Sequence, residues 1–127
     1  MSNPTFVQGS ITFPAAEKLE KFRLVTIDDK GAVKHAGAEG AIFGAVTEKA
    51  DPENHALPTN IAVHYGVCAV KVTVDGDAKA IKAGAPVYAA ADGKVAPTGT
   101  VKVGVAARDG EGGRVLTVLN ALPQASA

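Results

Sequence analysis

The sequence has few of the residues from which active sites and metal centres are usually built. One cysteine in 127 residues excludes an internal disulfide and a cysteine-only metal site. Serine occurs only at Ser2, Ser10 and Ser126, and the residues around Ser10 lack the G-x-S-x-G pattern of a hydrolase nucleophile. We therefore expect a protein that is not an enzyme and that carries no cofactor.

The sequence also lacks long apolar runs and an excess of charge of either sign. No run approaches the roughly 20 apolar residues of a transmembrane helix, and Met1–Thr5 lacks the basic region and apolar run of a secretory signal. Thirteen Lys and Arg balance 13 Asp and Glu, which argues against nucleic acid or an anionic membrane as a partner held by electrostatics. We expect synthesis in a cytoplasm and little charge repulsion against docking on a larger protein surface.

What the chain does have is valine, alanine, glycine and proline in short alternating groups. In the last third, four valine-containing runs lie within residues 81–88, 91–95, 101–106 and 114–119, separated by Gly, Asp and Pro. Short apolar runs bounded by turn residues are typical of antiparallel strands joined by tight turns. The pattern predicts a mainly β fold.

The first half of the chain shows a similar order of features. Val25 and Val87 are 62 positions apart, Val33 and Val95 are also 62 apart, and the glycines of Phe43–Val46 and Val103–Ala106 are 60 apart. We interpret this as an internal duplication; the alternative is chance similarity between Gly/Ala/Val-rich segments. Two such units predict a small antiparallel β-barrel or sandwich of two similar halves.

Three regions are expected along the chain. Residues 1–14 form a flexible N-terminal arm in which Ser10–Phe13 has strand-like alternation, residues 15–122 form a single β-rich domain, and residues 123–127 form a tail. Asp77–Ala83 is predicted as one short helix, with Asp77 as N-cap and the following glycine ending it. Glu48–Asn60 is the longest predicted loop and a candidate contact surface.

The isolated polar residues favour structural roles. Cys68 lies among valines and alanine, which favours a buried thiol over a nucleophile. His35, His55 and His64 have no metal-ligand spacing, although convergence of the three in space stays open.

Three further motifs are incomplete. Asp75–Asp77 begins like a calcium loop, but Lys79 stands where a further oxygen ligand belongs. Gly110–Gly113 is similar to a phosphate cradle but is followed by a strand-like run instead of a helix. Both are interpreted as hairpin turns. Lys79 lacks the sequence triplet of a lipoyl or biotinyl carrier domain.

With these segments identified, the chain resembles the small head-decoration (capsid cement) proteins of tailed bacteriophages. The most specific part is Ile-x-Ala-Gly-x-x-Val-Tyr at Ile81–Tyr88, followed by Val-Gly-Val-Ala at Val103–Ala106. The family commonly has Asp after the first glycine, where this chain has Ala85, a difference that affects a turn. The other parts are Leu24–Val25, Phe43–Val46, Gly66–Val67, Gly93–Val95 and Val115–Leu119.

The resemblance implies a structural protein, made in the host bacterial cytoplasm, that binds the outer capsid surface of the virion and stabilises contacts between capsid subunits. It implies the major capsid protein as partner and a homotrimer as the assembly. We expect the arm to order on the capsid and to add an edge strand there; a disordered tail, or a strand of the domain itself, is the alternative. The expected capsid-binding residues are Pro4, Thr5, Phe6, Val7, Ile11 and Phe13.

A second function stays open at this point. A small ligand- or carbohydrate-binding β-domain displayed on a virion would also be β-rich and lack catalytic motifs. Such a domain calls for exposed aromatic side chains, and the chain has two tyrosines and four phenylalanines to supply them.

Overall fold

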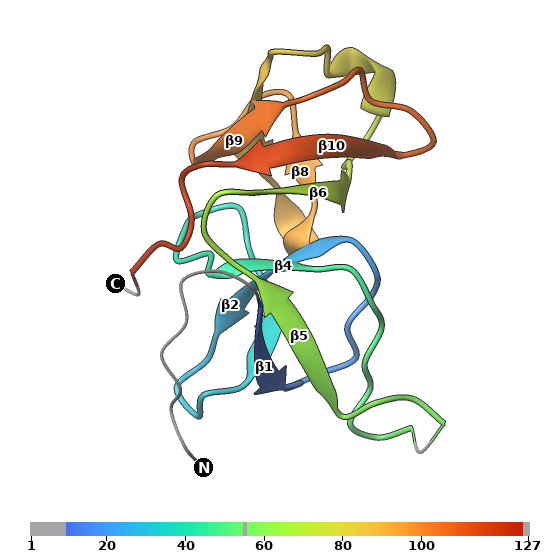
Figure 1. Cartoon of the computed structure of the whole chain (residues 1–127), viewed down its shortest axis with the longest axis vertical. Coiled ribbons are helices and arrows are strands. Elements are labelled where there is room, and N and C mark those ends of the chain that lie inside the picture. Colours follow the sequence, from blue (N-terminus) through green and yellow to red (C-terminus); the bar gives the residue numbers. More distant parts are fainter. Residues whose placement is uncertain (1–9, 55, 126–127) are drawn as a thin grey trace.

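The computed structural model describes residues 10–54 and 56–125 and shows two antiparallel five-stranded sheets with almost no helix (Figure 1). The first sheet consists of β1 (Ser10–Pro14), β2 (Arg23–Ile27), β3 (Val33–His35), β4 (Gly44–Val46) and β5 (Asn60–His64). The second consists of β6 (Cys68–Thr73), β7 (Pro86–Ala89), β8 (Val95–Ala96), β9 (Lys102–Ala106) and β10 (Arg114–Leu119). The predicted mainly β class with two similar halves is confirmed.

The two sheets have the same topology. Their strand orders are β1-β5-β4-β2-β3 and β6-β10-β9-β7-β8, so adding five to each label of the first sheet gives the second. The registers correspond as well, because Phe13 pairs with Ile61 in the same way that Val72 pairs with Val115. The repeat of strands inferred from the sequence is therefore present in the structure.

The hairpin turns repeat at the predicted spacing of 62. The Asp28 N–H donates to the carbonyl of Ala32 at 2.8 Å, and the first and last residues of 90–94 are bonded in the same way at 2.8 Å. Gly31 and Gly93, the penultimate turn residues, have φ of +81° and +71°. A residue with a side chain adopts this conformation only at a cost, which explains why glycine recurs in both turns.

The edges of each sheet meet at one point. A parallel bridge joins Ala15 to Val33, and its counterpart joins Val74 to Val95. Each bridge connects the end of the first strand of a sheet to its last strand, so each sheet curls around its own core. A single bridge in each sheet does not close a fully hydrogen-bonded barrel. The molecule is better described as two curled sheets.

In the first sheet, the strands β2 and β4 bury side chains on both faces. Val25 and Val46 belong to a core enclosed by the first half, whereas Leu24 and Ala45, their neighbours on the same strands, belong to the core of the second half. This accounts for the continuous apolar run predicted at residues 41–47, because a strand with two buried faces does not alternate. The strand itself covers only Gly44–Val46.

Two predicted boundaries change. Ser10–Pro14 is β1, paired along its length with β5, so the assignment of residues 10–14 to a flexible arm is wrong. The predicted helix is a single 3₁₀ turn, η1 (Ala78–Ala80), in which the Asp77 carboxylate accepts the Lys79 N–H at 3.0 Å. None of the helical turns in residues 10–54 and 56–125 has the length or apolar character needed to cross a lipid bilayer.

Phe22 joins the two halves at the surface. Its carbonyl accepts the Thr73 N–H of β6 at 2.8 Å, and the Arg114 guanidinium of β10 stacks 4.3 Å from the centre of its ring. Phe22 has φ of +59°, and Gly84, the residue 62 positions later, has φ of +84°. A phenylalanine is therefore held in a conformation that suits glycine, at the point where the sheets meet.

Gly44 and Gly104 provide a test of the repeated packing. A Cβ on Gly44 would lie 2.1 Å from the His64 carbonyl oxygen, and one on Gly104 would lie 2.1 Å from that of Val118. We expect Gly44→Ala and Gly104→Ala each to lower the free energy of unfolding by about 3 kcal/mol, because the backbone of the adjacent strand must move. Urea denaturation followed by circular dichroism measures this.

The matched control is Gly37→Ala, since no atom lies within 4 Å of the Cβ that it adds. We expect this variant to stay within about 1 kcal/mol of the wild type. Equal stability of all four proteins would show that β4 and β9 do not pack as described.

Candidate docking surfaces

The two predicted arm residues in the described region lie inside the domain. Ile11 and Phe13 are half-buried on the inner face of β1, where they pair with Val63 and Ile61. The Phe13 ring packs edge-on against Phe43, with ring centres 5.4 Å apart. Ile11–Phe13 is thus a strand of the domain itself, and its contact with a capsid stays a prediction.

The other predicted contact residues, Pro4, Thr5, Phe6 and Val7, lie outside the described residues. β1 stands at the end of the strand order of the first sheet. The segment that contains these four residues thus leads directly into an edge strand.

The described cysteine and histidines, Cys68, His35 and His64, form no metal site. Cys68 is half-buried and packs against the core of the second half, and burial raises the pKa of its thiol, which favours the neutral form. His35 and His64 lie on different strands, and His55 is outside the described residues. Within residues 10–54 and 56–125, no three His, Cys, Asp or Glu side chains are grouped so as to hold a metal ion.

His35 has a structural role instead. Its Nε2 accepts the Glu20 N–H at 3.1 Å, and its Nδ1 lies 3.4 Å from a carboxylate oxygen of Glu17. Burial lowers the pKa of His35, although the nearby Glu17 carboxylate opposes this effect. The neutral imidazole therefore ties residues 17–20 to β3.

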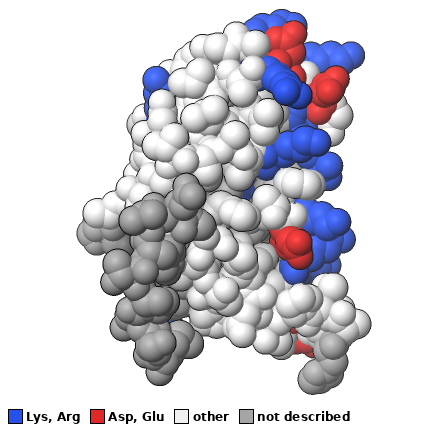
Figure 2. Space-filling model, viewed as in Figure 1, with Lys and Arg blue, Asp and Glu red and all other residues white. Residues whose placement is uncertain are grey.

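Charge is unevenly distributed over the surface. Figure 2 shows Lys and Arg side chains gathered along one edge of the molecule, over both halves, next to a broad face with almost no charge. On the strands of this face, outward positions include Ala62, Ala69, Leu116 and Val118. Val67, between β5 and β6, is 77% exposed. Although the net charge of the chain is zero, its surface thus has a positively charged edge and an uncharged face.

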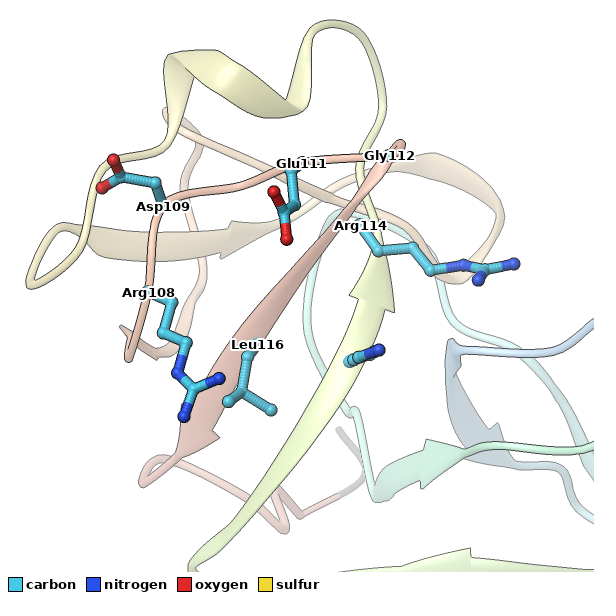
Figure 3. Close-up of a pocket in the computed structure, with 7 residues that line it drawn as sticks. Arg108, Asp109, Glu111, Gly112, Arg114 and Leu116 are labelled. Carbon is cyan, nitrogen blue, oxygen red and sulfur yellow. The ribbon is translucent and has the colours of Figure 1, made fainter.

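A cavity of about 490 Å³ lies where the charged edge meets this face, and we call it the β10 groove (Figure 3). It is bounded by the outer surfaces of β6 and β10 and by the loop between β9 and β10. Leu116 provides its apolar floor. The residues that line it are Lys71, Arg108, Asp109, Glu111, Gly112, Arg114 and Leu116.

The cations of the β10 groove lack carboxylate partners within the described chain. The ion pairs among the described residues are Lys18–Glu20 and Glu17–His35, and neither involves the groove. Asp109 points away from Leu116 in Figure 3, and its Oδ1 accepts the Ala83 N–H at 2.8 Å. Glu111 is thus the acidic residue left within the groove, which three cations also line.

A second cavity, of about 440 Å³, shares Gly112 and Arg114 with the β10 groove and extends the charged edge onto the first half. One of its residues, Arg23, donates from Nη1 to the Asp92 carbonyl at 3.0 Å, while its buried Nε has no hydrogen-bond partner. The remaining lining residues are Glu20, Lys21, Lys49, Thr73 and Gly113.

Sequence reasoning missed this charged edge. Its cations lie at positions 21, 23, 49, 71, 108 and 114, each on a different turn or strand or at its end. The only local signal was the Gly110–Gly113 turn, which the sequence identified as a hairpin and which the structure places beside both cavities.

Comparison with known proteins is informative at the level of solved structures. No protein-family model and no curated protein matches the sequence. Among solved structures, the chain is similar to the head fiber gp8.5 N base of bacteriophage phi29, with a TM-score of 0.68 at 20% identity. The similarity covers 95% of this chain and 100% of that one. At this identity, the likeness establishes the shared fold.

The His35 contacts predict a pH dependence of stability. The unfolded chain takes up a proton near the ordinary pKa of 6.5, whereas the folded chain does so at lower pH. Stability should therefore be fully present above pH 6.5 and decline as the pH falls below it. Thermal melts between pH 8 and pH 5.5 measure this, with His35→Gln as the comparison, because the glutamine oxygen can accept the Glu20 N–H. A decline of equal size in both proteins would assign it to other groups.

Proposed function

We propose that this chain is a structural decoration protein that binds the outer surface of an assembled phage head and stabilises the contacts between capsid subunits. The observation that carries the proposal is the likeness to the head fiber base, which extends over nearly the whole of both chains. The sequence resemblance to head-decoration proteins independently supports a role on the phage head. The proposed role involves no catalysis.

The proposed mechanism is stabilisation of the assembled shell by mass action. A ligand that binds the assembled shell but not dissociated subunits stabilises the shell by an amount that grows with its concentration and affinity. The major capsid protein is the proposed partner. A homotrimer of the chain would engage several capsid subunits at once and gain avidity without strong individual contacts.

The domain has features that suit such docking. The broad uncharged face over β5, β6 and β10 requires little charge desolvation when it is covered by another protein (Figure 2). Val67, exposed between β5 and β6, supplies apolar area for contact. We assign additional contacts to Pro4, Thr5, Phe6 and Val7, because the segment that contains them precedes the edge strand β1.

Removing residues 1–9 tests both the role and the segment. Because β1 begins at Ser10, we expect the truncated protein to keep the melting temperature of the full chain. We expect its affinity for purified phage heads that lack this protein to fall about tenfold, which corresponds to the loss of one or two good apolar contacts. Co-sedimentation with the heads measures occupancy.

Removal of residues 1–3, which leaves Pro4–Val7 in place, is the matched control and should bind like the full chain. Unchanged binding after removal of residues 1–9 would refute the assignment of Pro4, Thr5, Phe6 and Val7 as contact residues. It would leave the proposed decoration role intact. Failure of the full chain to bind heads, or to raise the temperature at which they release DNA, would refute the role.

A further inference from the structure

The basic rim of the β10 groove is not required by the fold. At the positions of the first half that are equivalent by strand pairing, Thr12 corresponds to Lys71 and Asn60 corresponds to Arg114. The backbone topology is the same in both halves, yet the first half has no cation at these two positions. The charges thus belong to the second half alone and need an explanation other than folding.

Two of the three cations that line the groove have no evident structural role. Lys71 and Arg108 are exposed, and neither forms an ion pair among the described residues. Arg114 differs, because it covers the Phe22 ring. Two unmatched cations beside a third produce a local positive potential, which a negatively charged partner would relieve.

The floor of the groove adds an apolar element. Leu116 is half-buried between Lys71 and Arg108, and Figure 3 shows its side chain next to the Arg108 guanidinium. Along the outer surface of the same sheet, Val118 and its pairing partner Ala69 continue the apolar strip. A partner that fits therefore combines negative charge with an apolar side chain.

Nucleic acid fits this groove poorly. Single strands are held largely by bases stacked on aromatic rings, and none of the described residues that line the two cavities is aromatic. Glu111 and Glu20 lie among the cations and would repel a chain of phosphates. An acidic polypeptide, whose charges are wider apart and interspersed with apolar side chains, matches the mixed lining better.

We infer that the β10 groove is a docking site for an acidic protein segment that places an apolar side chain on Leu116 between Lys71 and Arg108. The identity of the protein that carries this segment, a capsid subunit, rests on the function proposed above. The chemistry of the site rests on the groove itself.

A defined peptide tests the chemistry without a capsid. The probe is an eight-residue peptide of glutamate with one central leucine, titrated into the isotopically labelled full chain and followed by NMR. We expect shifts at Arg108 and Leu116, and binding that weakens as sodium chloride is raised from 50 to 300 mM. Reversing both charges, Lys71→Glu with Arg108→Glu, should weaken binding about tenfold or more.

The matched control reverses two exposed lysines of the first half that line neither cavity, Lys30→Glu with Lys34→Glu, and thus has the same net charge. We expect it to bind the peptide within about twofold of the wild type, because distant exposed charges are screened. Equal weakening in both variants would show a general charge effect and overturn the site. So would tighter binding of a single-stranded thymidine octamer than of the peptide.

Binding to phage heads separates this inference from the proposed function. If the wild type binds heads and the groove variant binds about tenfold more weakly, the groove contacts the capsid. If both bind equally, the docking site is refuted while the decoration role stands. If the wild type does not bind heads, the decoration role fails, and the peptide titration alone decides whether the groove accepts an acidic segment.

Discussion

The contact of Leu24 and Ala45 with the second core is the interaction on which the rest of this structure depends. Each half encloses a small core of its own, but the first sheet also contributes side chains from its opposite face to the core of the second half. Because β2 and β4 are buried on both faces, the two halves cannot separate without exposing apolar surface to water. The duplicated chain therefore behaves as one unit.

This junction also determines where the surface features lie. Phe22 reaches from the start of β2 to the Thr73 N–H of β6 and to the Arg114 side chain of β10. Arg114 borders both cavities, so the groove on the second half and the cations of the first half form a single charged edge. The uncharged face lies beside that edge (Figure 2), and the molecule presents two surfaces of different chemistry to a partner.

The repeat shows which features the fold requires and which it leaves free. Gly44 and Gly104 recur because the carbonyl of the neighbouring strand occupies the space of a Cβ, and Gly31 and Gly93 recur because the turn has positive φ. Surface positions are under no such constraint, and there the halves differ, as Thr12 and Lys71 illustrate. Differences at equivalent exposed positions are therefore where a specific function of one half is most visible.

The sequence by itself determined the short strands, the turns and the duplication, because these depend on local residue preferences and on spacing along the chain. It also identified Asp77 as a cap and Glu48–Asn60 as a long loop, for the same local reason. Only the tertiary structure decided that Ile11 and Phe13 face inward, since strand alternation does not say which partner a segment will choose. The β10 groove likewise required the fold, because a formal charge of zero contains no information about which lysines and arginines a sheet brings together.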